Sequence, residues 1–243
     1  MDPVQHQDEI SCIVPGSGLP ASTGRFAHVS SPGVNDRALV FLTDFADQAV
    51  ILSLLLTVLL VLSLQRRWRV IAAWLIAIPG VLGVLLILKI TFYACGWLLP
   101  AFGPDRWALK SPSGHTASAA VTYGAIVALT AARTKSAAVS PVLTTVLAAI
   151  LLALAVGVTR VQLGAHSLSE VVVAAGIGTL GAVAFVVIAG RHMAERSGVP
   201  VIAGTLLMLL LSHGHHLPVE GTLQRNAAQM LRHWITSCEM KAD

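Results

Sequence analysis

The sequence predicts an all-α membrane protein, a single bundle of five to six transmembrane helices. Of its 243 residues, 55% are hydrophobic and 12% are charged, and this charged fraction is about half of that in a soluble domain. The apolar residues gather in long runs, and about 20 helical residues cross a hydrocarbon core. Backbone groups in lipid must be satisfied within their own segment, and the runs lack the alternation of a membrane β-barrel.

The chain is expected to have one folded domain between two polar tails. Residues 1–37 are rich in Gly, Ser and Pro and lack hydrophobic periodicity, so a mobile tail is expected there. They do not resemble a signal peptide, because a basic segment and a compact apolar core near Met1 are both missing. The transmembrane domain is expected over 38–212, and a polar C-terminal tail over 213–243.

Six apolar runs make up the predicted transmembrane domain. The first run begins with an amphipathic segment, Asp44 to Asp47, which suits the membrane interface, and the second contains Pro79, which predicts a kink. The sixth run is short for a full crossing and is equally compatible with a tilted span, a re-entrant segment or an interfacial one. The runs cover residues 38–64, 70–95, 115–132, 141–158, 168–190 and 199–212.

The charges between the runs predict an orientation. If every run crosses, one side carries Arg66, Arg67, Arg69, Arg133, Lys135, Arg191 and Arg196. Short basic loops face the cytoplasm, so the opposite, outer face carries Lys89, the loop 96–112 and the segment 160–170. The net charge of +4 comes mostly from these loops and does not indicate a nucleic-acid partner.

A short polar segment before the third run holds the first candidate residues. Ser113, Gly114 and His115 lie where the helix 115–132 is expected to begin. A glycine lets the backbone approach a ligand closely, and the N–H groups of a helix start favour anions such as phosphate. The same residues also fit a plain helix cap. Both interpretations stay open from the sequence alone.

A second polar segment lies between the fourth and fifth runs. Arg160 lies at the end of the fourth run. A charged side chain there is costly to place in a membrane and therefore indicates a functional role. A side chain that snorkels to the interface is a common alternative. His166 and Glu170 are four residues apart, so on a helix they share a face where the carboxylate can fix the imidazole tautomer. Ser167 and Glu170 also fit a capping box.

Together these residues favour phosphoryl transfer. A neutral histidine can act as the nucleophile while a protonated one acts as the general acid. Lys89 alone fits snorkelling, but with Arg160 and the helix-start N–H groups it can stabilise a transferring phosphoryl group. This chemistry requires no metal or other cofactor. The histidines of residues 213–216 are interpreted as a solvated turn, because acidic and Cys partners are missing nearby.

The motifs resemble those of the type 2 phosphatidic acid phosphatase superfamily, whose helical acid phosphatase core is shared with vanadium haloperoxidases. The family pattern is K-x6-R-P, then P-S-G-H, then S-R-x5-H-x3-D. Residues 112–115 match the second piece in full, and residues 159–170 match the third with two conservative changes. Lys89 matches only the start of the first piece, because Gly96 and Trp97 replace its Arg and Pro. The resemblance covers roughly 70–190.

The resemblance implies a role for each matching residue. His166 would be the nucleophile that forms a phosphohistidine, His115 would protonate the leaving group, and Glu170 would orient His166 in place of the family Asp. Arg106 or Lys110 is a hypothetical replacement for the missing guanidinium, which a lysine does not equal. Phosphate oxygens would be bound by Lys89, Arg160 and the backbone of Ser113 and Gly114.

The predicted function is metal-independent hydrolysis of a lipid phosphate or diphosphate, a step of phospholipid metabolism. The expected location is a bacterial inner (plasma) membrane, and the loop charges predict that the site faces the periplasm or exterior. Phosphatidic acid, phosphatidylglycerol phosphate, isoprenyl diphosphate and lipid A phosphates are candidate substrates, and the sequence does not select among them. A family member that binds phospholipid headgroups or a membrane partner without catalysis is the alternative, and transport is a third interpretation.

Overall fold

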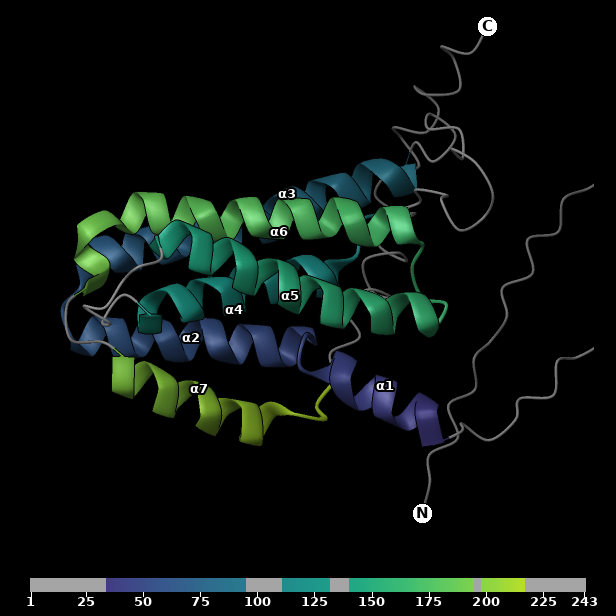
Figure 1. The fold of residues 1–243 in the computed structure, drawn as a ribbon, viewed down its shortest axis with the longest axis horizontal. Helices are drawn as coiled ribbons and strands as arrows, with labels where there is room; N and C mark the ends of the chain where they lie inside the picture. Colours follow the sequence, from purple (N-terminus) through teal and green to yellow (C-terminus); the bar gives the residue numbers. More distant parts are fainter. Residues whose placement is uncertain (1–33, 95–110, 132–139, 195–197, 217–243) are drawn as a thin grey trace, which may run out of the picture. The chain divides into compact units, whose positions relative to one another are not determined.

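The computed structural model describes residues 34–94, 111–131, 140–194 and 198–216, and all regular structure within them is helical. Figure 1 shows the main helices running side by side along the bundle. The predicted all-α membrane bundle is confirmed. The elements are α1 (Val34–Asp44), α2 (Gln48–Leu64), α3 (Trp68–Ala94), α4 (Gly114–Ala131), α5 (Pro141–Gln162), α6 (Leu168–Ala189), the 3-10 helix η2 (Gly190–Ala194) and α7 (Gly198–Ser212).

The first apolar run forms two helices where the sequence predicted one. α1 ends at Asp44 and α2 begins at Gln48, with a turn between them. The backbone of Asp47 is extended, and its carboxylate accepts a hydrogen bond from the Ala49 N–H at 2.8 Å. An aspartate in this position is a favoured helix N-cap. The polar residues of the turn therefore start a new helix at this point.

Four described segments are long and apolar enough to cross a membrane: Arg37–Leu64, Trp68–Phe92, Pro141–Gln162 and Leu168–Ala189. α4 is not among them, although it runs alongside the others (Figure 1). Most of its residues are buried, and it packs against α3, α5 and α6. Since these neighbours separate α4 from lipid, it can carry Ser and Thr and still lie inside the bundle.

Small residues set the distance between α4 and α6. A Cβ placed on Gly178 would lie 2.7 Å from the Ala120 Cβ, and one on Gly181 would meet Val81 and Val121. Small residues at such a contact let two helix backbones approach closely. Nothing lies within 4 Å of a Cβ on Gly176. Gly178 and Gly181 therefore allow close helix packing, whereas Gly176 has no such contact among the described residues.

The larger apolar side chains fill the space between α2, α3, α4 and α6. Trp74 and Phe185 are fully buried and meet edge to face, with ring centroids 5.8 Å apart. α7 packs against α2, where Gly204 faces Thr57. With 15 residues, α7 is about 22 Å long and shorter than a hydrocarbon core of about 30 Å.

Candidate active site

Glu170 joins the start of α6 to the segment that precedes α4. Its side chain is buried, with 4% of the residue exposed. The Oε1 atom accepts a hydrogen bond from the Ser111 N–H at 2.7 Å, and the backbone carbonyl accepts one from the Ser113 N–H at 3.3 Å. The two motif segments, 59 residues apart in sequence, are therefore in direct contact.

The second oxygen of Glu170 serves both interpretations made from the sequence. Oε2 accepts from the Ser167 N–H at 3.1 Å, while the Ser167 hydroxyl accepts from the Glu170 N–H at 3.3 Å. The predicted capping box is thus confirmed. The same Oε2 lies 2.8 Å from Nδ1 of His166. One carboxylate therefore caps the helix and contacts the imidazole.

The contact with Glu170 defines the chemistry of the two ring nitrogens of His166. A carboxylate accepts hydrogen bonds, so Nδ1 donates, and in a neutral imidazole the lone pair then lies on Nε2. The connection 163–167 turns tightly, and Gly164 takes up a positive φ of 67° within it. The Arg160 carbonyl accepts from the His166 N–H at 3.3 Å. The last turn of α5 therefore lies beside the imidazole.

Ser113 caps α4, which was one of the two interpretations of this segment from the sequence. It is fully buried, and its hydroxyl accepts from the Thr116 hydroxyl at 3.0 Å and more weakly from the Thr116 N–H at 3.5 Å. A helix cannot satisfy the N–H groups of its first turn by itself, and these groups attract anions. The cap and a phosphate cradle are therefore compatible in this segment.

Lys89 lies against the start of α4. It is buried, with 6% of the residue exposed, so it does not snorkel outward to water. A Cβ placed on Gly114 would be 3.6 Å from the Lys89 Cε and 3.9 Å from the Gln48 Nε2. These are ordinary contact distances. The backbone of Gly114 therefore lies close to a buried ammonium-bearing side chain.

Asp47 is a site residue that the sequence reasoning missed. It is buried, with 7% of the residue exposed, and its Oδ2 lies 4.0 Å from Nε2 of His115. A carboxylate at this distance favours the protonated imidazole. The sequence does contain a signal for this residue, because Asp47 directly precedes a long apolar run. An aspartate in that position is typical of a helix N-cap, and a carboxylate in a membrane is costly and therefore indicates a function.

The end of α7 reaches the same group of residues. His216 lies 3.6 Å from Asp47 and 3.8 Å from Asp44, while His213 packs against the rings of Phe41 and Phe45. The sequence interpretation that no acidic partner lies near these histidines is therefore wrong. Within the described part of the chain, no group of three or more His, Cys, Asp or Glu side chains could hold a metal ion.

The structure brings His166, Glu170, Ser113, Gly114 and Lys89 to one end of the bundle, together with His115 and Arg160. Arg106 and Lys110 lie outside the described residues, as do Gly96 and Trp97 at the altered first motif. The hypothesis that Arg106 or Lys110 replaces the missing guanidinium stays a prediction.

The fold and this site define an integral membrane protein with a polar histidine site at one end of its helical bundle. A family model described as the PAP2 superfamily matches residues 92–194. The match includes the P-S-G-H segment and the segment from Arg160 to Glu170, so the family resemblance is confirmed over this part of the chain. These findings fit a membrane phosphatase. Comparisons with curated proteins and with solved structures found no match.

Proposed function

We propose that the protein is a phosphatase that hydrolyses a lipid phosphate or diphosphate through a phosphohistidine on His166. The observation that carries this proposal is the 2.8 Å contact between Glu170 and Nδ1 of His166. It holds the tautomer in which Nε2 has the lone pair. A buried, oriented imidazole with its second nitrogen available is the arrangement that a nucleophilic histidine needs.

In the proposed first step, Nε2 of His166 attacks phosphorus and the bond to the leaving oxygen breaks. His115 gives its proton to that oxygen, and Asp47 favours the protonated imidazole from which this proton comes. In the second step His115 takes a proton from water, whose oxygen attacks the phosphohistidine. Inorganic phosphate leaves, and His166 regains its lone pair.

In this proposal, cations and the N–H groups at the start of α4 stabilise the negative charge on the transferring phosphoryl group. Lys89 lies beside Gly114, and Arg160 is joined through its carbonyl to the His166 N–H. Fixed cations and N–H groups stabilise charge as it develops in a phosphoryl-transfer transition state. In this proposal, Arg106 or Lys110 supplies the cation that the first motif lacks, and alanine variants of both with unchanged phosphatase kinetics would exclude this role.

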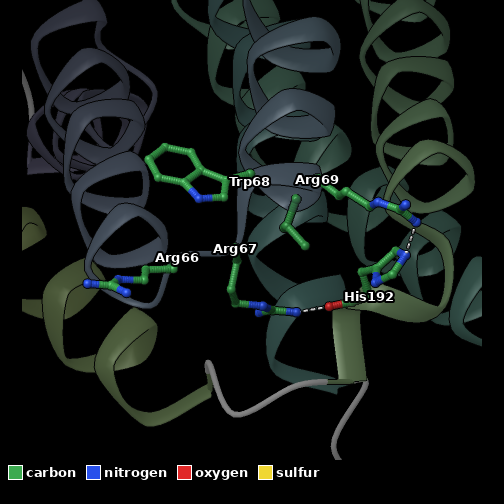
Figure 2. A pocket seen from close by; sticks show the side chains of 6 residues that line it. Arg66, Arg67, Trp68, Arg69 and His192 are labelled. Atoms are coloured by element: carbon green, nitrogen blue, oxygen red, sulfur yellow. Dashed lines mark hydrogen bonds between the residues drawn. The ribbon is translucent and has the colours of Figure 1, made fainter.

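The proposed location of this site is the outer face of a bacterial plasma membrane. The observation in its favour is the basic group where α2 connects to α3, formed by Arg66, Arg67 and Arg69 (Figure 2), because short basic loops face the cytoplasm. Lipid substrates would enter laterally between helices. Phosphatidic acid, phosphatidylglycerol phosphate, isoprenyl diphosphate and lipid A phosphates remain the candidate substrate classes.

The test is phosphate release by the purified full chain on a panel of these lipids, with and without His166→Ala. Wild-type release on at least one lipid, lost in the variant, is the expected result. No release on any panel member would contradict the proposal.

A second candidate function is lipid-headgroup binding without catalysis. It is favoured by Gly96 and Trp97, which stand where the family pattern has Arg and Pro. Losing a bidentate phosphate ligand weakens the stabilisation of the transition state. The same assay separates the two functions, because a binding protein retains a lipid phosphate and releases no inorganic phosphate.

A further inference from the structure

The start of α2 lies against the start of α4 and brings two adjacent polar side chains to this contact. Asp47 caps α2, and its Oδ2 lies 4.0 Å from Nε2 of His115. Gln48 is the first residue of α2, and its Nε2 would lie 3.9 Å from a Cβ placed on Gly114. Two consecutive residues at one helix start therefore face two consecutive residues at the other. The proposed function uses Asp47 and assigns no role to Gln48.

Gly114 lies at the end of α4 where a phosphate is expected to bind. The Cα–Cβ bonds of an α-helix tilt toward its N-terminus, so groups around a Cβ on Gly114 lie toward that end of α4. The Lys89 Cε, at 3.6 Å from this Cβ, is one such group, and the Gln48 Nε2 is another. The N–H groups of a first helical turn attract anions at the same end. A phosphoryl group held there would therefore lie next to Lys89 and the Gln48 amide.

The side chain of Gln48 has the chemistry of a phosphate ligand. Its amide carries two N–H donors, and a hydrogen bond to a charged acceptor is stronger than one between neutral groups. Gln48 is half-buried, and a neutral amide costs less to remove from water than a second cation would. The donor lies in a site where Gly96 stands in place of the arginine of the family pattern.

We propose that Gln48 is a further substrate-binding residue, whose amide donates to an oxygen of the phosphoryl group at the start of α4. This inference rests on the proposed function, in which Gly114 and Lys89 bind the same group. The start of α2 then belongs to the active site, with Asp47 serving the leaving-group side and Gln48 the phosphoryl group. Both residues precede the segment 92–194 that the family model matches.

Two substitutions of Gln48 separate its hydrogen bond from its place in the helix. Gln48→Met removes the donors and keeps a side chain of similar length with good helix propensity. Gln48→Glu keeps the shape and sets a carboxylate against the phosphate. An acidic residue is favourable in the first turn of a helix, so neither variant should unfold α2.

Gln162 provides a matched control for the added charge. It is the exposed last residue of α5, two positions after Arg160 and so at the same end of the bundle. Gln162→Glu makes the same chemical change as Gln48→Glu. A general effect of one negative charge on an anion would appear in both variants, whereas a contact with phosphate is lost only at Gln48.

The experiment titrates the purified full chain in neutral detergent with inorganic phosphate, the product of the proposed reaction, and follows the thermal unfolding midpoint. Gln48→Met should weaken phosphate binding about tenfold, as expected for a lost hydrogen bond to a charged group. Gln48→Glu should weaken it further, and Gln162→Glu less than about twofold. Without phosphate, the midpoints of the Gln48 variants should match that of wild type, which a purely structural role of Gln48 would not allow.

Because this titration needs no turnover, it separates the role of Gln48 from the proposed hydrolysis. Phosphate binding that depends on Gln48, in a protein that hydrolyses no lipid of the panel, would support the ligand and reject the phosphatase. Hydrolysis that needs His166 but keeps its kcat/KM in Gln48→Glu would reject the role of Gln48 and leave the phosphatase standing. Equal weakening by Gln48→Glu and Gln162→Glu, unchanged binding in Gln48→Met, or no phosphate binding by wild type would also overturn that role.

Discussion

The two ends of the bundle carry similar basic and imidazole groups in different pairings: two histidines of the candidate active site lie beside carboxylates, whereas His192 at the opposite end contacts Arg67 and Arg69. At the candidate active site, His166 lies 2.8 Å from Glu170 and His115 lies 4.0 Å from Asp47. At the opposite end, His192 contacts Arg69.

This difference separates two kinds of chemistry. Helix N-termini are present at both ends, from α4 and α6 at one and from α3 at the other, so their dipoles alone do not distinguish the ends. A carboxylate fixes the tautomer of an imidazole or favours its protonation, which is what proton transfer requires. The end that carries His166 therefore has the carboxylate and imidazole pairs that the proposed catalysis needs.

The largest effect is expected from Glu170→Gln. The amide can still accept one hydrogen bond, but it no longer holds His166 in the required tautomer. We expect the rate of phosphate release to fall about 10²- to 10⁴-fold, measured on the best substrate of the lipid panel.

Ser167→Ala is the control that separates capping from catalysis. It removes the hydroxyl that accepts from the Glu170 N–H and should cost about 1 kcal/mol of stability. The contact between Glu170 and His166 remains, so the rate should stay within a few-fold of wild type. Equal losses of rate in the two variants would mean that Glu170 acts only as a cap.

Gly178→Ala tests whether close packing of α4 on α6 holds the active-site end together. The new Cβ would lie 2.7 Å from the Ala120 Cβ and 3.0 Å from the Ala117 Cα. Overpacking of this kind costs about 1–3 kcal/mol, which thermal unfolding in detergent would register. Gly176→Ala, on the same helix with nothing within 4 Å, should leave the unfolding midpoint unchanged or raise it. Equal midpoints for the two variants would contradict the packing.

Asp47→Asn tests the carboxylate beside His115 without removing the helix cap. Asparagine caps helices about as well as aspartate, so the unfolding midpoint should hardly change. The rate on alkyl phosphates should fall about tenfold, as is usual when a residue that orients a catalytic group is lost. Aryl phosphates, whose leaving group needs little protonation, should be affected less. A uniform loss on both substrates would argue against a role through His115.

The smallest effect is expected from Arg66→Gly at the opposite end. Arg66 has a left-handed backbone with φ 56° and ends α2 in a position where glycine is usual, since Arg66 N–H and Arg67 N–H donate to the Ser63 and Leu62 carbonyls. A left-handed backbone is unfavourable for a residue with a Cβ and not for glycine, so the free energy of unfolding should rise by no more than about 1 kcal/mol. Phosphate release should not change. A clear loss of activity would show that the two ends are coupled.

The bundle and the grouping of the candidate site residues could be predicted because both leave local signals. Apolar runs mark helices, loop charges group Lys89, His115 and His166 at one end, and the spacing of Ser167 and Glu170 marks a capping box. Each of these inferences needs only neighbouring residues or the alternation of loops across a membrane.

The roles of Asp47 and Gly176 could not be predicted from the sequence, because they depend on which helix faces are in contact. The role of Asp47 depends on the start of α2 lying beside the start of α4, and no periodicity links those two helices. Gly176 and Gly178 look alike in sequence, and only the face that α6 turns towards α4 separates them. The same limit applies to the contacts of Arg67 and Arg69 with His192, which lies more than 100 residues later in the chain.

The most direct test of the central claim is to isolate the phosphorylated protein. His115→Ala, given an aryl phosphate with a labelled phosphoryl group, should still be phosphorylated but should release phosphate slowly, because it lacks the base that activates water. After quenching in alkali, where a phosphohistidine survives, peptide mass spectrometry should find the label on His166. The label should be absent when His166→Ala is added. A label on another residue, or phosphate release by an active wild type without any phosphorylated protein, would contradict the account.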